Sequence, residues 1–415
     1  MQAESTYSFV KRSAAERQRS AAMYLLLACG VGGLLFRFWL TAYSIGCNDA
    51  DIWLEHARLI AKHGVSFAYQ HPELESLQYN HPPLMGYLSL WADHATGGDL
   101  RAFSVFMKVP GLLAELLSAW LLWKIRSKQG AIAGASVVAG YGLSLTQIEV
   151  AGFHCNTDAA YAGLSLLAFY LMHEKRSPGL SGLALAAALN VKLLPIFVAP
   201  ALLSQCRSWR ELRRFVAASS LAIVPYVPFL VTVPKELYRN VVQYNSQQLE
   251  WGISMFLKQA NEHSALLGRL NPLIMQFASE GRWLILAAIV TAGLLSFACS
   301  RRFAYHAGAL AWALFLVLTP GWGVQYAVCV VPLLFAVNVR TGVLYSTLAG
   351  VMLFFIYTEH MDFRLPLHGY VQYYPFPKAA VLFGLLAWVT LLRFVIVTTR
   401  ELAADATDWT AMPQG

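Results

Sequence analysis

The chain has 415 residues, of which 57% are apolar and 13% are charged, with a formal net charge of +8. A soluble domain averages about 25% charged residues, and the mean hydropathy here is +0.49, so the composition excludes an ordinary soluble globule. Apolar runs near the length of a membrane span recur from end to end. The sequence therefore predicts one all-α, polytopic membrane domain over residues 1–415, with about 11–12 membrane segments.

The first predicted span covers about residues 22–46 and lacks a small-residue cleavage site, so we expect it to remain as an anchor. The tail before it carries Lys11, Arg12, Arg17 and Arg19, which predicts a cytoplasmic N-terminus. Residues 45–101 then form a large outside loop. Its stretch "CNDADIWLEHARLIAKHG" (47–64) places two acids before an amphipathic pattern, which indicates a helix lying at the membrane interface.

The remaining spans alternate between basic inside loops and outside loops. Spans at 103–124 and 158–173 return to the basic stretches "KIRSK" and "EKRS", with a span at 131–149 between them. Further outside loops are expected at 234–281 and 358–378, and the later spans at 214–233, 283–299, 304–319, 325–338, 342–357 and 379–398. Each short inside loop carries Lys or Arg, so one topology satisfies the positive-inside rule and places the C-terminus in the cytoplasm.

Residues 179–204 do not fit a single span. One helix through them would bury Lys192 at mid-depth, close to Pro195, while both flanks are basic and therefore expected inside. Two half-helices hinged near Asn190–Lys192 satisfy both facts. Each would have about 12 residues and a length of roughly 18 Å, and broken helices of this kind are tolerated where they line a cavity.

This topology brings Asp49, Asp51, Asp158 and the hinge at Lys192 to one membrane face. Two interpretations of the acids remain open. Asp49 or Asp51 can cap the amphipathic helix, and Asp158 can cap the span that it begins. Capping does not account for both members of the Asp49–Asp51 pair, which favours a functional site at this face.

Several motifs resemble those of the GT-C superfamily of integral membrane glycosyltransferases. The acid pair and the helix with "EHARLI" resemble the superfamily's first outside loop. The stretches "YNHPPLMGYLSL" (79–90), "GFHCNTD" (152–158) and "LNVKLLPIFVAPALL" (189–203) are similar to motifs of glucosyltransferases that extend lipid-linked oligosaccharides. The stretch "GWGVQY" (321–326) resembles bacterial polyprenyl-phosphate-dependent mannosyltransferases.

The resemblance implies inverting transfer of a hexose, glucose or mannose, from a polyprenyl-phosphate donor. The acceptor would be a lipid-linked or cell-envelope glycan on the non-cytoplasmic face of a bacterial inner membrane or the endoplasmic reticulum. An inverting displacement needs a carboxylate to accept the proton of the attacking hydroxyl. Asp49 aligns with the leading acid of the superfamily's loop and is the expected base. Asp51 is the second candidate, or it binds an acceptor hydroxyl.

A cation is expected at the leaving phosphate, because negative charge develops there. Lys192 suits this role, since a lysine without a partner at membrane depth is costly unless it functions. The alternative is a lysine that extends its amine to the membrane face. Arg239, in the second outside loop, is a weaker candidate for the same task.

Further candidates for substrate binding come from three other segments. Asn80 and His81 precede the pair Pro82-Pro83, where a rigid turn is the alternative. His154 lies near Asp158 and would line the cavity with it. Tyr326 and Trp322 suit stacking on sugar or lipid, although aromatic residues also mark membrane interfaces.

We expect no metal and no cofactor, because no pair of histidines or acids shows ligand spacing within one helix. Cys47 and Cys155 lie beside the two acid motifs, either bonded to each other or unpaired. The expected partners are membrane lipids, the donor lipid and a glycan or glycolipid acceptor, and no nucleic acid. A multi-pass transporter or lipid flippase is the alternative function, since broken helices and buried lysines suit transporters as well.

Overall fold

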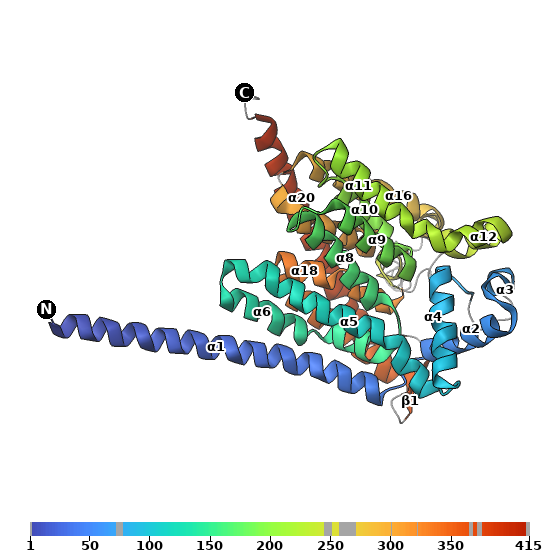
Figure 1. The fold of residues 1–415 in the computed structure, drawn as a ribbon, viewed down its shortest axis with the longest axis horizontal. Helices are drawn as coiled ribbons and strands as arrows, with labels where there is room; N and C mark the ends of the chain where they lie inside the picture. The colour runs from blue at the N-terminus through green and yellow to red at the C-terminus, as the bar shows by residue number, and fades with distance from the viewer. Residues whose placement is uncertain are drawn as a thin grey trace.

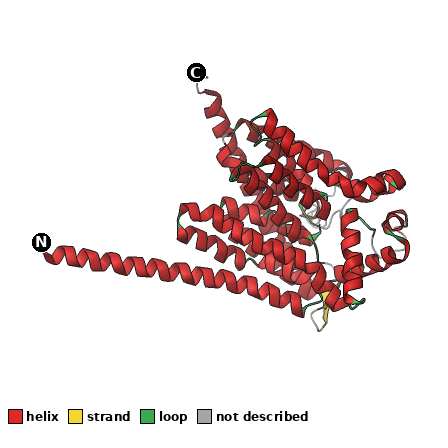
Figure 2. Cartoon of the chain, in the orientation of Figure 1, coloured by secondary structure: helices red, strands yellow, loops and turns green. Residues whose placement is uncertain are grey.

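The computed structural model describes residues 2–71, 78–244, 251–256, 271–299, 301–321, 323–364, 368–371 and 376–411. Helices make up nearly all of this part of the chain, and the strands β1 (Met361–Arg364) and β2 (His368–Val371) form one antiparallel hairpin (Figure 2). The predicted all-α membrane bundle is thus confirmed. The hairpin was missed, because two strands of four residues leave no clear period in the sequence.

The long helix α1 (Gln2–Tyr43) runs along one side of the bundle and packs on α6 (Ala131–Gly142) (Figure 1). Their backbones approach so closely that a Cβ on Gly33 would overlap the carbonyl of Gly142. A buried ion pair joins Arg37 of α1 to Glu115 of α5 (Leu100–Arg126). A charge buried among apolar helices is costly without such a partner, so the pair fixes how α1 docks.

The first outside loop folds into three short helices at one end of the bundle, as Figure 1 shows: α2 (Asp49–His63), α3 (Val65–Gln70) and α4 (Pro83–Thr96). The apolar face of α2 buries Trp53, Leu54, Ala57 and Ile60, and α2 packs against α4. The charged side chains of Arg58 and Lys62 remain exposed. The amphipathic helix predicted after Asp49 and Asp51 is confirmed.

A sharp turn then links the third and fourth spans. After α6 the chain bends by 49° into α7 (Leu145–Gln147) and η3 (Ile148–His154), and α8 (Asp158–His173) follows three residues later. Within the turn, Cys155 adopts a left-handed conformation with φ 65°. The turn brings the start of α8 to the same end of the bundle as α2.

The predicted broken pair is also present. Helix α9 (Pro178–Val191) ends before Lys192, and η4 (Leu194–Val198) and α10 (Ala199–Leu203) follow. The next helix, α11 (Trp209–Ser219), runs parallel to α9, because Gly182 meets Phe215 while Asn190, further along, donates to the carbonyl of Ala222. Two successive helices can be parallel only if the chain between them returns across the bundle.

The second half of the chain completes the bundle. Its elements are η5 (Ser220–Tyr226), α12 (Val227–Thr232), α13 (Pro234–Leu237), η6 (Tyr238–Val242), α16 (Asn271–Ala298), η7 (Arg301–Phe303), α17 (Ala304–Leu318), η8 (Val324–Val328), α18 (Val331–Val337), α19 (Val339–Phe355), η9 (Ile356–His360) and α20 (Lys378–Ala411), and η2 (Ser127–Gln129) precedes α6. Helix α16 begins at Asn271, inside the loop predicted at 234–281, so that loop is shorter than expected. The residues missing from the described ranges include Trp322.

Every predicted span coincides with an apolar helical segment, but the segments differ in length. Within the described ranges, six helices are long and apolar enough to cross a membrane, or seven if the bent segment α6–η3 is one span. Others, such as α8 and α17, have 16 and 15 residues. A helix of that length reaches only about 23 Å, against a hydrocarbon core of about 30 Å. Both termini lie at the end of the bundle away from α2–α4 (Figure 1).

Candidate active site

Two clusters of polar side chains meet where α2, α8 and the break after α9 converge. The first surrounds Asp49, at the start of α2. The Oδ2 atom of Asp49 accepts a hydrogen bond of 2.6 Å from Asn156 Nδ2 and lies 3.3 Å from His154 Nε2. Within the described part of the chain, both of these contacts fall on Oδ2, which leaves Oδ1 to accept a proton from a substrate.

Local backbone geometry explains how His154 and Asn156 reach one carboxylate oxygen. Gly46 has φ 110°, and a Cβ there would lie 2.5 Å from the carbonyl oxygen of Phe153, so only glycine lets the link between α1 and α2 pass the turn. The backbone N–H of Thr157 donates to Asn156 Oδ1 over 2.6 Å, which turns the amide N–H₂ of Asn156 toward Asp49.

Tyr357 orients His154 from the opposite side. The distance between the Tyr357 hydroxyl and His154 Nδ1 is 2.6 Å. This contact holds the imidazole ring in place, so that its Nε2 atom faces Asp49. Tyr357 and Asn156 were absent from the residues predicted from sequence.

The electrostatics of Asp49 favour its ionised form. Burial opposes the charge of this carboxyl, but the charge of His154, the hydrogen bonds from His154 and Asn156, and the charge of Lys192 together lower its pKa. The carboxylate is therefore charged at neutral pH and able to accept a proton. It does not cap α2, which has Asn48 at its N-cap and no side-chain capping bond.

The second cluster holds the hinge lysine, and here one expectation from the sequence was wrong. Lys192 does not lack a partner: its Nζ lies 3.2 Å from Asp158 Oδ1, with side-chain exposures of 12% and 0%. The ammonium also lies 4.4 Å from the centre of the Tyr326 ring. The charge is thus balanced at depth, as buried charges generally require. Asp158 serves this pair and Tyr161, and the N-cap of α8 is Thr157.

The two clusters act on each other. The Lys192 charge contributes to lowering the pKa of Asp49, and Asp158 Oδ2 is buried without a hydrogen-bond partner among the described residues. Val191 and Leu193, on either side of the lysine, pack against the apolar core beneath α2–α4. The carboxylate of Asp49 and the ammonium of Lys192 thus belong to one site at one end of the bundle.

The remaining predicted residues occupy different places. His81 lies at this site with its ring 4.2 Å from that of Trp53, and burial, then the charges of Lys192 and His56, lower its pKa well below the ordinary value. A neutral imidazole suits a sugar hydroxyl better than a phosphate. Asn80 is partly buried beside it. Arg239 is exposed and bonds to Asn240, whose amide holds the carbonyl of Tyr69, so no contact recorded here brings it to Lys192.

Cys47, Asp49 and His154 place possible metal-ligand atoms within 4.8 Å of one another. Their contacts do not suit one shared ion, however. The Cys47 sulfur approaches Nδ1 of His154 at 3.5 Å while Asp49 approaches Nε2, and these nitrogens point away from each other. Nδ1 is also taken by Tyr357. Cys47 and Cys155 are both free thiols.

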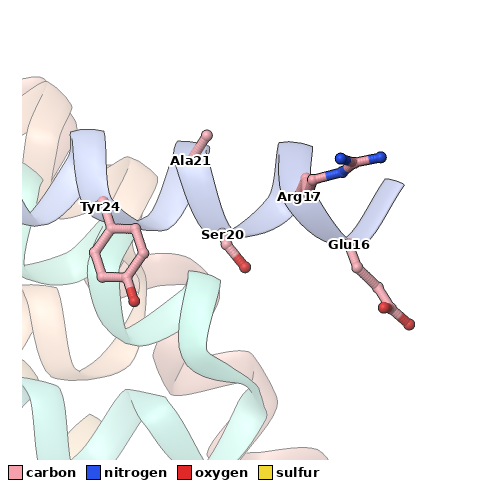
Figure 3. Close-up of a pocket in the computed structure, with 5 residues that line it drawn as sticks. All are labelled: Glu16, Arg17, Ser20, Ala21 and Tyr24. Carbon is pink, nitrogen blue, oxygen red and sulfur yellow. The ribbon is translucent and has the colours of Figure 1, made fainter. Parts of the chain in front are cut away.

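A depression of ≈ 670 Å³ lies far along the chain from these residues, at Glu16, Arg17, Ser20, Ala21 and Tyr24. Figure 3 shows that all five side chains project from the single helix α1. One helix does not enclose a ligand, so this depression is no rival to the site at Asp49.

A many-helix membrane bundle with a carboxylate and an ammonium in one terminal site defines a multi-pass membrane protein equipped for chemistry at a membrane face. The sequence comparison supplies the family: the chain belongs to glycosyltransferase family 87, whose model matches residues 79–322, more than half of its length. The predicted glycosyltransferase is thus confirmed at the level of the family.

The chain is also similar in structure to ArnT from Cupriavidus metallidurans, whose crystal structure is described as bound to undecaprenyl phosphate. The two share 15% sequence identity with a TM-score of 0.49, and the match covers 93% of this chain and 74% of that one. Among curated proteins, none matches the chain in sequence.

Proposed function

We propose that this protein is an inverting glycosyltransferase that moves a hexose, glucose or mannose, from a polyprenyl-phosphate donor to a glycan or glycolipid acceptor. Transfer occurs at the membrane face where α2–α4 lie. Family membership supports the reaction class, and the polyprenyl-phosphate ligand of ArnT supports the donor class. The observation that carries the proposal is a carboxylate whose contacts with the described residues fall on one oxygen, in the same site as a buried ammonium.

In the proposed step, the acceptor hydroxyl gives its proton to Asp49 Oδ1 as its oxygen bonds to the anomeric carbon. The bond from that carbon to the phosphate oxygen breaks, and its electron pair leaves with the polyprenyl phosphate. His154 and Asn156 are positioning residues, since their contacts with Oδ2 turn Oδ1 toward the acceptor. General-base assistance of this kind contributes about 10²–10⁴ in rate.

Lys192 would receive the donor phosphate by exchanging partners. In the absence of donor its ammonium is bound to Asp158, so an arriving phosphate must compete with that carboxylate for the cation. The hydroxyl of Tyr161 also donates a hydrogen bond to Asp158. It can stabilise that carboxylate when Lys192 turns away toward the phosphate. The phosphate of the leaving polyprenol then carries charge stabilised by the amine.

His81, Asn80 and Tyr326 complete the proposed sugar and donor site. The neutral ring of His81 can donate to or accept from a sugar hydroxyl, and the buried ring of Tyr326 packs on the lysine that receives the phosphate. No metal enters the proposed step. The transporter alternative has no observation in its favour once the family is known.

Purified protein in nanodiscs, given a radiolabelled polyprenyl-phosphate hexose and a short glycolipid acceptor, tests the proposal. We expect a labelled product of inverted anomeric configuration that fails to form with Asp49→Asn. Equal product from wild type and Asp49→Asn rejects the site. A product formed only with nucleotide-sugar donors rejects the donor class.

A further inference from the structure

A cavity of ≈ 470 Å³ opens between the beginning of α9 and the second half of α11 with the start of η5, at the end of α9 opposite Lys192. Its lining includes two arginines and three leucines, namely Arg176, Arg214, Leu180, Leu183 and Leu221. Since α9 has 14 residues, the cavity lies roughly 20 Å from the active site. Neither the family nor the proposed transfer accounts for it.

The cavity is a wedge formed by the way the two parallel helices diverge. A Cβ on Gly182 would lie 2.5 Å from the carbonyl oxygen of Phe215, so the helices nearly touch there. Gly179, three residues earlier on the same side of α9, has nothing within 4 Å of its Cβ position. The space therefore widens toward the membrane face at which both helices begin.

The wedge is charged at its wide end and apolar along its walls. Arg176 precedes α9 and Arg214 lies at the middle of α11, whereas Leu183 and Leu221 lie further along the same direction, in α9 and η5. Leu180 and Leu221 are each 52% exposed and Leu183 is 43% exposed. Leucines left open on the surface of a membrane bundle face lipid chains, so the wedge matches the polarity of an amphiphile.

The two arginines are available to an anion. Neither has an ion pair or hydrogen bond with any described residue, whereas Arg301 is paired with Glu211 at 3.0 Å. Arg176 also ends α8 in a left-handed conformation with φ 50°, while the next residue, Ser177, donates to the carbonyl of Leu171. Glycine normally occupies that place in a helix terminus, so an arginine there keeps a strained backbone for the sake of its side chain.

We propose that this cavity binds an anionic phospholipid, with its phosphate between Arg176 and Arg214 and an acyl chain along the three leucines. Basic pockets between membrane helices bind anionic headgroups in this way. The charge complementarity selects an anion, and the exposed leucines select a lipid over a free phosphate. The bound lipid holds the beginning of α9 against α11 and so stabilises the broken helix that ends at Lys192.

Delipidated protein, titrated separately with phosphatidylglycerol, phosphatidylcholine and inorganic phosphate, tests this proposal by native mass spectrometry and thermal melts. We expect phosphatidylglycerol alone to form a retained 1:1 adduct and raise Tm. The double variant R176Q/R214Q should bind it about 30-fold more weakly, from about fivefold for each surface cation lost. The matched control R210Q/R213Q loses the same charge on α11 outside the cavity and should bind as wild type does.

A second variant removes the space without changing charge. Gly179→Leu fills the open position and should abolish the adduct while the protein still folds, because nothing lies within 4 Å of its Cβ. Equal weakening by the two double variants, or an adduct undiminished in Gly179→Leu, overturns the site. Protection by inorganic phosphate equal to that by phosphatidylglycerol overturns the lipid as occupant. These readouts measure binding, so they stand apart from any result on sugar transfer.

Discussion

His154 Nε2 lies 3.3 Å from Asp49 Oδ2, and Tyr357, 203 residues further along the chain than His154, holds the other nitrogen of the same ring. The pair joins the amphipathic helix α2 to the turn before α8. It defines the orientation of the carboxylate proposed as base, and the first two predictions test it.

Asp49→Asn should lower kcat by at least about 10²-fold, because an amide cannot accept the acceptor's proton. The fold should persist, since Asn keeps the size of the side chain and can still bond to Asn156. Asp51→Asn, two positions along α2, is the matched control and should keep most of the activity. If Asp51→Asn is instead the inactive variant, the site stands and the base has been misassigned.

His154→Leu should shift the acid limb of the pH profile of kcat/KM to higher pH. The pKa of Asp49 is lowered by His154 against the opposing effect of burial, so losing His154 raises that pKa. Because the base must be ionised, activity is lost as pH falls through the pKa, and in the variant this loss begins at a higher pH. His154→Gln keeps an N–H donor and should restore much of the wild-type profile. An acid limb that does not move in His154→Leu contradicts the positioning role.

Lys192→Met should destabilise the protein, because it leaves the carboxylate of Asp158 buried and unpaired. Breaking a buried ion pair from one side costs about 3–5 kcal/mol. The double variant Lys192→Met/Asp158→Asn removes both charges and should recover much of the lost Tm, yet transfer sugar about 10²–10³-fold more slowly than wild type. Thermal melts measure the change in stability and turnover rates measure the change in catalysis, so the two experiments together separate these effects. Normal turnover in the stable double variant would remove Lys192 from the phosphate site.

Single cysteines at Ser177 and Ser208, before α9 and α11, should react with an impermeant maleimide from the same side of the membrane. The parallel course of α9 and α11 requires this result, since the chain crosses back between them. A background without the exposed Cys29 keeps the signal clean. Reaction from opposite sides would show that residues 179–204 cross the membrane once.

The helical segments could be predicted because their determinants are local. Apolar runs define the spans, and the period of apolar residues after Asp51 defines α2. The broken helix followed from Lys192, Pro195 and two basic flanks within one short stretch. Each of these signals lies within a few turns of the structure that it predicts.

The partners within the site could not be predicted in the same way, because they are distant in sequence. Lys192 meets Asp158 across 34 residues, and His154 meets Tyr357 across 203. Hydrophobic periodicity in a single sequence does not indicate that two residues so far apart are in contact. The buried pair Arg37–Glu115 did leave a signal, since each residue interrupts an apolar run and a charge in a span generally has a partner. That signal does not reveal which charges pair.

The contact of Tyr357 with His154 also sets an order for biogenesis. A ribosome that has released the chain only as far as α8 has already made Asp49, His154 and Asn156, yet the phenol that contacts the imidazole belongs to η9. Translation of nearly 200 further residues must precede completion of the site. A chain truncated anywhere before η9 therefore keeps Asp49, His154 and Asn156 but lacks the hydroxyl that orients the imidazole toward the carboxylate.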